Sequence, residues 1–191
     1  MVITQNDVNN DLNMLTSELT GQNRQLVSPV DALKLSMAWP MVCVSAYAIS
    51  LAINVVLFKA PDDPFFSGLN PYFHYMGADL AAGAISLFFA LAIGFGLYGP
   101  AMAYLSIPKE ARQKSIIISR LKKMAAKMGV ITAGCNIMLA LFSFFYSAAI
   151  CAAPIMLLVT FLVMQGVMSA EITRYGMSTV IGKVSKLLKK I

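Results

Sequence analysis

The chain has 191 residues, of which 58% are hydrophobic and only 13% are charged, with a formal net charge of +6. Because an ordinary soluble domain has about 25% charged residues, this composition excludes a soluble monomer, and it is too apolar for an intrinsically disordered chain. Three cysteines are an odd number, which excludes a disulfide-bonded scaffold.

Residues 1–34 are polar and precede the apolar part of the chain. A stripe of aliphatic side chains at helical spacing predicts a short amphipathic helix over residues 6–20. The stripe consists of Val8, Leu12, Leu15 and Leu19. We expect this helix to pack on the membrane surface, on a cytoplasmic loop or on a partner protein. The segment lacks the basic start of a signal peptide, so we expect it to stay on the mature protein.

A second helix is predicted to start at Ser28-Pro29, because serine is a favoured N-cap and proline fits a first helical turn. We expect this helix to run without a break into the first membrane span.

Uncharged stretches of the chain are long enough to cross the ~30 Å hydrocarbon core of a bilayer as helices. The last of them, residues 128–170, would form one helix about 65 Å long and must therefore fold back on itself. We expect its second arm to begin at Pro154. The sequence thus predicts an all-α, four-helix polytopic membrane protein with spans at about residues 35–58, 80–104, 128–149 and 153–170.

The connection between the first two spans, residues 59–79, is rich in proline and in aromatic residues. Its three prolines disfavour a regular helix over most of its length. Its aromatic side chains are Phe65, Phe66, Tyr72, Phe73 and Tyr75. Two interpretations stay open. They form either an aromatic belt at the membrane interface or an exposed loop that binds a partner protein, since aromatic residues dominate binding hot spots.

The second span carries small residues at four-residue spacing, which let another helix approach closely. We assign helix packing to Ala82, Ser86, Ala90 and Gly94. Residues 94–99 also match the dinucleotide-binding fingerprint letter for letter. No strand precedes them, so we attribute these glycines to close packing.

Polar side chains within the spans are few, and two of them lie at similar depth. We expect Asn136 and Gln165 to hydrogen-bond each other across the third and fourth spans. The cysteines Cys43, Cys135 and Cys151 lack a pair motif and are interpreted as packing residues.

The two remaining polar segments are basic. Residues 109–127 follow Pro108, and we expect one long helix that continues into the third span. The tail, residues 171–191, has apolar residues on one helical face and lysines off it. This pattern predicts a basic amphipathic helix that lies on an anionic lipid surface.

Basic residues are distributed unequally between the two sides of the membrane. The leader, the second connection and the tail together contain 14 of them, whereas the first connection contains only Lys59. The positive-inside rule then places both termini in the cytoplasm. The organisation follows as a cytoplasmic leader (1–34), a membrane domain (35–170) and a cytoplasmic tail (171–191). Because topology accounts for the charge, no nucleic-acid partner is needed.

The sequence lacks the constellations that catalysis, cofactor binding and metal binding require. His74 is the only histidine and has no cysteine near it. No charged residue falls inside a predicted span, where proton relays place them, and no nucleophile–base pair is visible. We therefore expect a non-enzymatic membrane protein, with no cofactor and no metal, that acts by protein–protein recognition.

The opening Met1-Val2-Ile3-Thr4-Gln5, the leucine-striped acidic leader and the small hydrophobic body resemble the TraS-type entry-exclusion proteins of F-like conjugative plasmids. The resemblance implies a bacterial inner-membrane protein of the recipient cell that blocks redundant DNA transfer by recognising the donor's mating-pair stabilisation protein. It supplies no motif whose residues carry over. Two alternatives stay open, an immunity protein against a pore-forming bacteriocin and a structural subunit of a larger membrane complex. Self-association into a homo-oligomer also stays open.

Overall fold

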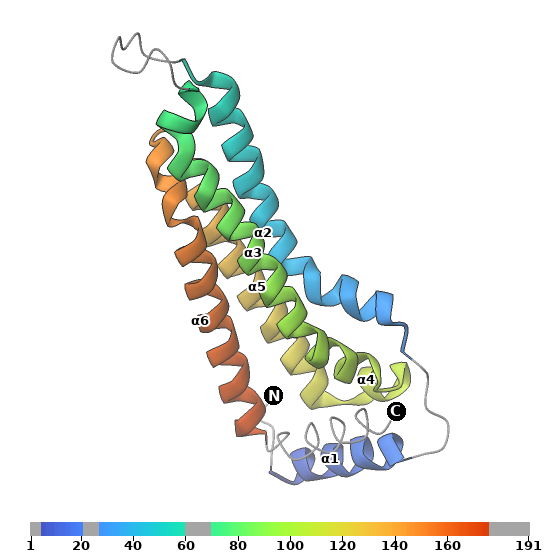
Figure 1. Ribbon diagram of the computed structural model, residues 1–191. Helices are drawn as coiled ribbons and strands as arrows, with labels where there is room; N and C mark the ends of the chain where they lie inside the picture. Colours follow the sequence, from blue (N-terminus) through green and yellow to red (C-terminus); the bar gives the residue numbers. More distant parts are fainter. Residues whose placement is uncertain (1–4, 21–26, 60–69, 176–191) are drawn as a thin grey trace. The chain divides into compact units, whose positions relative to one another are not determined.

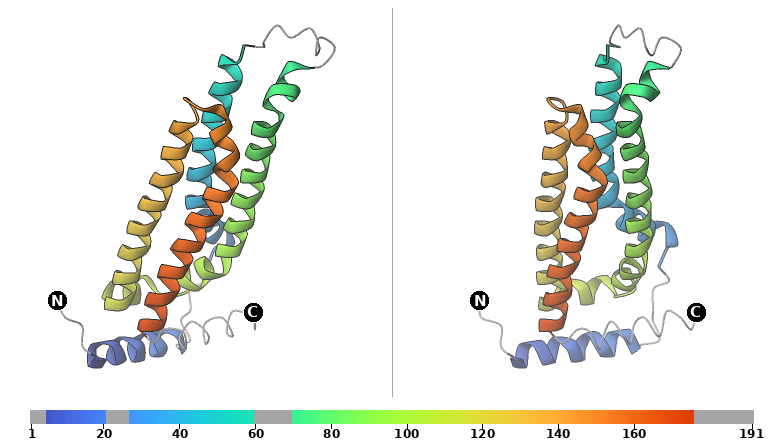
Figure 2. Two further views of the ribbon diagram at one scale, coloured as in Figure 1. Left: turned by 90° about the vertical axis from the view of Figure 1, so that its left-hand side faces the viewer. Right: turned by 60° about the vertical axis from the view of Figure 1, so that its left-hand side comes forward.

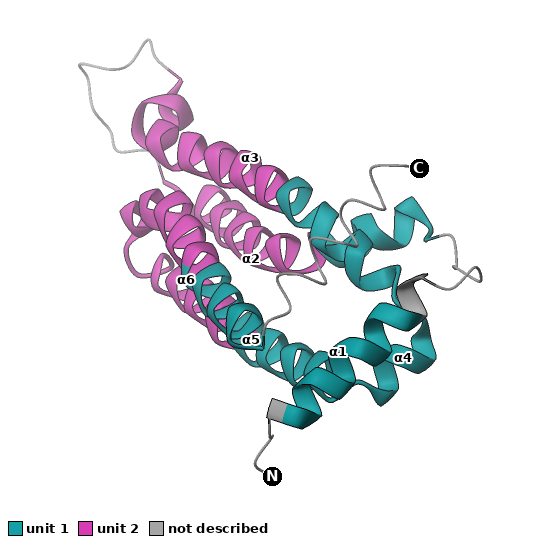
Figure 3. Cartoon of the chain, turned by 90° about the horizontal axis from the view of Figure 1, so that it is seen from below, with its two compact units in different colours: residues 1–36, 94–129, 163–191 teal, residues 37–93, 130–162 magenta. Residues whose placement is uncertain are grey.

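The computed structural model describes residues 5–20, 27–59 and 70–175, and every regular element within these ranges is helical. Among the described helices, four are long and apolar enough to cross a membrane (Figure 1). The predicted all-α class and the four helices of spanning length are therefore confirmed. The chain divides into two compact units, coloured separately in Figure 3: residues 1–36, 94–129 and 163–191 form unit 1, and residues 37–93 and 130–162 form unit 2.

The helices of spanning length are longer than the spans predicted from hydropathy. They are α2 (Pro29–Leu57), α3 (Pro71–Leu105), α5 (Ile116–Phe142) and α6 (Ala153–Arg174). The shorter elements are α1 (Gln5–Thr20), α4 (Lys109–Lys114) and the 3₁₀ helix η2 (Ser147–Ala152).

Two helix starts lie where proline chemistry predicts them. Helix α2 begins at Pro29, where the carbonyl oxygen of Ser28 accepts hydrogen bonds from the backbone N–H groups of Asp31 and Ala32, and it runs unbroken to Leu57. Helix α6 begins at Ala153 and has Pro154 in its first turn. Pro40 lies inside α2 and cannot donate to the carbonyl of residue 36. In this helix, unit 1 ends at Ser36 and unit 2 begins at Met37.

The start of α3 differs from the prediction. The helix begins at Pro71 rather than near residue 80, so Tyr72, Phe73 and Tyr75 are helical and do not belong to an irregular loop. The reason is local, because the side-chain oxygen of Asn70 accepts a hydrogen bond from the backbone N–H of Tyr72 at 3.1 Å. Asparagine is a strong N-cap, and proline is favoured at the first helical position.

Helix α5 ends at Phe142, seven residues earlier than the predicted end of the third span. The Ser143 hydroxyl donates to the carbonyl oxygen of Ala140 at 2.8 Å and also pairs with the hydroxyl of Ser50. Short polar side chains that bond nearby backbone groups compete with helix continuation. A turn and η2 then lead into α6, and we call residues 143–152 the hairpin turn.

The long helix predicted from residue 109 into the third span is wrong. The backbone is extended at Ser115, which separates the six-residue α4 from α5. The Ser115 hydroxyl oxygen accepts a hydrogen bond from the backbone N–H of Ile118 at 3.1 Å, so Ser115 is the N-cap of α5.

In unit 2, stretches of α2, α3, α5 and α6 lie side by side (Figure 2). Tyr47 from α2 packs with Ala140, Ile150 and Ala153 from α5, η2 and α6. Helices α2 and α3 approach closely at Gly83, where a Cβ would lie 2.8 Å from a methyl group of Leu51.

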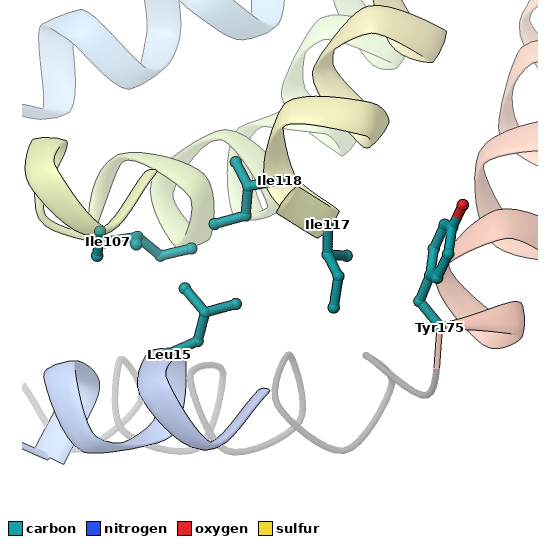
Figure 4. Close-up of a cluster of buried hydrophobic side chains, with 6 residues drawn as sticks. Leu15, Ile107, Ile117, Ile118 and Tyr175 are labelled. Carbon is teal, nitrogen blue, oxygen red and sulfur yellow. The ribbon is translucent and has the colours of Figure 1, made fainter. Parts of the chain in front are cut away.

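Unit 1 has its own apolar cluster, and α1 contributes a buried side chain to it. Leu15 of α1 is fully buried and belongs to one cluster with side chains from the segments around α4 and α5 and from the end of α6 (Figure 4). The buried members are Leu15, Ile107, Ala111, Ile117, Ile118 and Tyr175. Helix α1 therefore packs on protein within unit 1. The basic tail from residue 176 onward lies outside the described residues.

Candidate functional site

Exposed aromatic side chains gather where α2 ends and α3 begins, both in unit 2. The ring of Phe58 lies 5.6 Å from that of Tyr72 and 6.1 Å from that of Tyr75, measured between centroids. Tyr72 and Tyr75 are spaced three residues apart and share this face of α3. Phe73 is 73% exposed. We call Phe58, Tyr72, Phe73 and Tyr75 the aromatic end.

Two side-chain hydrogen bonds within unit 2 connect the hairpin turn to α3 and α2, and they show where it lies along these helices. The Cys151 thiol donates to a carboxylate oxygen of Asp79 in α3 at 3.3 Å, and the Asn54 amide of α2 donates to the carbonyl oxygen of Ser143 at 3.3 Å. Because a helix rises 1.5 Å per residue, Tyr75 and Tyr72 lie about 6 and 10 Å beyond Asp79 along α3. The aromatic end therefore projects past the level of the hairpin turn (Figure 2).

The hairpin turn carries exposed aromatic residues of its own, namely Phe144, Phe145 and Tyr146. Phe145 is 81% exposed, and Tyr146 stacks on Phe142 with a centroid separation of 5.4 Å. Aromatic rings at the end of a transmembrane hairpin are typical of an interfacial belt. The aromatic end lies farther along the helices than this belt.

The structure places some of the predicted partner-binding residues and not others. Tyr72, Phe73 and Tyr75 lie together on the first turns of α3, all exposed. Phe65 and Phe66 lie outside the described residues. Phe58, which contacts both tyrosines, was not singled out from sequence because it ends an apolar stretch and looks like part of the span.

The small residues assigned to helix packing are all buried, namely Ala82, Ser86, Ala90 and Gly94. Their role in helix packing stays a prediction. Within the described residues, two of the three glycines at 94–99 do not mark a close approach between helices. A Cβ added at Gly96 or Gly99 would meet no atom within 4 Å.

A polar network joins α2, α5 and α6 inside unit 2, and Asn136 is at its centre. Asn136 is fully buried. Its side-chain oxygen accepts from the Tyr47 hydroxyl at 2.7 Å, and its amide nitrogen donates to the hydroxyl of Thr160 at 2.9 Å and to the carbonyl oxygen of Thr132 at 2.8 Å. The predicted pairing of Asn136 with Gln165 is therefore wrong. Thr160, more than one turn away on α6, takes that place.

The side chains of this network satisfy one another. The Trp39 ring nitrogen donates to the Thr132 hydroxyl at 3.0 Å, and the Thr160 hydroxyl donates to the carbonyl oxygen of Met156 at 2.7 Å. Hydrogen bonds between helices hold membrane proteins together, since an unpaired polar group in hydrocarbon is costly. The network therefore has a structural role, because it holds three helices of unit 2 together.

Two predictions about single residues in unit 2 need correction. Asp79 was placed in the connection before the second span, but it lies inside α3 and is only 7% exposed. Of the cysteines interpreted as packing residues, Cys43 is buried, whereas Cys135 and Cys151 are exposed. Cys151 bonds Asp79 instead of filling a core.

A second polar site lies in unit 1, where Asp11 reaches the N-terminus of α5. One Asp11 carboxylate oxygen accepts from the Ser115 hydroxyl at 2.8 Å and from the backbone N–H of Ile117 at 2.9 Å. A carboxylate at a helix N-terminus also interacts favourably with the helix dipole. Sequence reasoning missed this site. A serine directly before three isoleucines was the available signal for an N-cap.

Within the described ranges, no group of three or more His, Cys, Asp or Glu side chains lies close enough together to hold a metal ion. Comparison with protein-family models, with curated proteins and with solved structures gives no match to this chain.

Proposed function

We propose that this chain is an integral membrane protein that recognises another membrane protein through the aromatic end. The observation that carries the proposal is the position of the two tyrosine rings about 6 to 10 Å along α3 beyond Asp79, the residue that contacts Cys151 of the hairpin turn. Rings that only anchor a helix at the interface have no need to project past the aromatic belt of their own bundle. Exposed tyrosine and phenylalanine on a helix end bury large areas at low entropic cost when a partner binds.

The biological role that we propose for this recognition is conjugative entry exclusion. The leader and the hydrophobic body resemble TraS-type proteins, and four helices of spanning length fit a protein of the bacterial inner membrane. In this role the partner is the donor's mating-pair stabilisation protein, and the aromatic end lies on the outer side, with both termini in the cytoplasm. The asymmetric distribution of basic residues supports this orientation.

The test compares two pairs of exposed aromatic residues in recipient cells that carry the gene. Tyr72→Ser with Phe73→Ser changes the aromatic end, and Phe145→Ser with Tyr146→Ser changes the hairpin turn as a matched control. We expect the first variant to raise the frequency of conjugation into the recipient by more than about tenfold at normal membrane level, because hot-spot residues are lost. The control variant should still exclude donors.

Three results would contradict the proposal. Equal loss of exclusion in both variants would make the aromatic end part of an interfacial belt. Intact exclusion in the first variant would move recognition to another surface. Protection of the cell against a pore-forming bacteriocin, without any effect on conjugation, would assign the chain to the immunity proteins instead.

A further inference from the structure

Exposed lysines follow one another along α4 and the first turns of α5 in unit 1. They are Lys109, Lys114, Lys122, Lys123 and Lys127, which we call the basic surface. Residues 109–127 contain seven basic residues and one acidic residue, so this segment alone carries as much net charge as the whole chain. Such a concentration of one sign creates a positive potential that attracts groups of the opposite charge.

The packing of unit 1 explains why the two lysines of α4 face outward. Helix α1 contacts α4, and Ala111 is buried in the apolar cluster beside Leu15. The guanidinium carbon of Arg112 lies 4.9 Å from the centre of the Tyr104 ring, so this cation is held against the protein. The apolar and aromatic contacts take up one side of α4, and its two lysines are left exposed.

Helix α1 does not supply a basic contact surface. Its described apolar residues Val8, Leu12 and Leu15 contact the cluster of unit 1. Its exposed residues include Asn6, Asn9, Asn10 and Asn13, and residues 5–20 contain no lysine or arginine. Helices that lie on an anionic bilayer usually carry basic residues on their polar face. Of the six lysines in the described part of unit 1, five belong to the basic surface.

We propose that the basic surface binds the headgroups of anionic phospholipids in the leaflet next to it. Separate lysines on long flexible stems, distributed over two helices, fit a fluid layer of phosphate groups better than one shaped anion or an ordered protein partner. The break at Ser115, held by Asp11, separates the two lysines of α4 from the three of α5 and gives them different helix axes. This inference does not depend on the proposed role in conjugation.

The experiment uses the purified full-length chain in phosphatidylcholine vesicles that contain a trace of spin-labelled lipid. Electron spin resonance measures the fraction of labelled phosphatidylglycerol, or of labelled phosphatidylcholine, that the protein immobilises. We expect the wild type to prefer phosphatidylglycerol. Lys109→Gln, Lys114→Gln, Lys122→Gln and Lys123→Gln together should reduce that preference by at least about threefold. Arginine at the same four positions keeps the charge and is the matched control, expected to retain the preference.

Other outcomes decide against the proposal. An unchanged preference in the glutamine variant overturns it, and so does an equal loss in the arginine variant. If only glutamine at Lys183, Lys186, Lys189 and Lys190 removes the preference, the tail binds the lipid and the basic surface does not. Should the fourfold variant fold poorly, a salt titration of the wild type replaces it. A preference that persists at 1 M salt, where the Debye length is about 3 Å, contradicts binding by exposed lysines.

Discussion

At the scale of single residues, the side chain of Asn136 forms three hydrogen bonds that join three helices. It uses its oxygen and both amide hydrogens, and its partners lie on α2, α5 and α6. A buried asparagine with these contacts fixes both the depth and the rotation of the helices that meet at it. Hydrogen bonds between transmembrane helices contribute on average about 0.6 kcal/mol each, and unpaired groups cost more.

We predict that Asn136→Ala lowers the free energy of unfolding in detergent by about 1–3 kcal/mol, because the Tyr47 hydroxyl loses its acceptor and the Thr160 hydroxyl loses the amide that donates to it. Denaturation followed by circular dichroism measures this change. Tyr47→Phe removes one of these bonds and should cost less. Asn54→Ala removes one hydrogen bond of 3.3 Å from a partly buried side chain, so it should lower the free energy of unfolding by a still smaller amount. Equal effects from all three substitutions would show that the network does not tie the helices together.

At the scale of elements, α1 contacts the rest of unit 1 through its apolar residues and through Asp11. We predict that Asp11→Ala weakens the docking of α1 by about 2 kcal/mol, since hydrogen bonds to a charged group are worth about 1.5–3 kcal/mol and the helix dipole of α5 loses its counter-charge. Hydrogen exchange of the α1 amides should then become faster. Asn10→Ala changes the exposed neighbour and should leave exchange as it is. The prediction is wrong if the two variants exchange alike.

Helix α3 offers a second comparison, between a buried and an open position. Ala90 is fully buried, whereas a side chain at Gly96 would meet nothing within 4 Å. We predict that Ala90→Leu destabilises the protein by about 1–3 kcal/mol through overpacking. Gly96→Leu should be tolerated, as should Leu91→Ile. Thermal unfolding in detergent measures all three. A neutral Ala90→Leu would show that the small residues of α3 do not form a packed face.

At the scale of the whole molecule, hydropathy predicted the four long helices because the length of an apolar stretch is a property of the chain alone. The break at Ser115 was not predictable in this way. Its N-cap Ser115 is a local signal, but the carboxylate that bonds this serine belongs to Asp11, 104 residues away in the sequence. Depth in the membrane suggested Gln165 as the partner of Asn136, but depth does not fix helix rotation, and Thr160 faces Asn136 instead. Asn70-Pro71 is a typical helix start and could have predicted the beginning of α3. The prolines of the connection were instead interpreted as evidence against a helix.

The last prediction concerns topology, and the burial of each candidate position decides where a label can report it. Ser115 is buried and bonded to Asp11, so a cysteine there would report the docking of α1 and not the side of the membrane. Ser119, exposed on α5, is the better position. In a background where Cys43, Cys135 and Cys151 are alanine, we predict that Ser67→Cys reacts with an impermeant maleimide on intact spheroplasts. Ser119→Cys and Ser185→Cys should react only after the membrane is permeabilised, since basic segments stay in the cytoplasm. Labelling of Ser119→Cys from outside would reverse the orientation, place the aromatic end in the cytoplasm and remove the surface on which we propose that a donor cell is recognised.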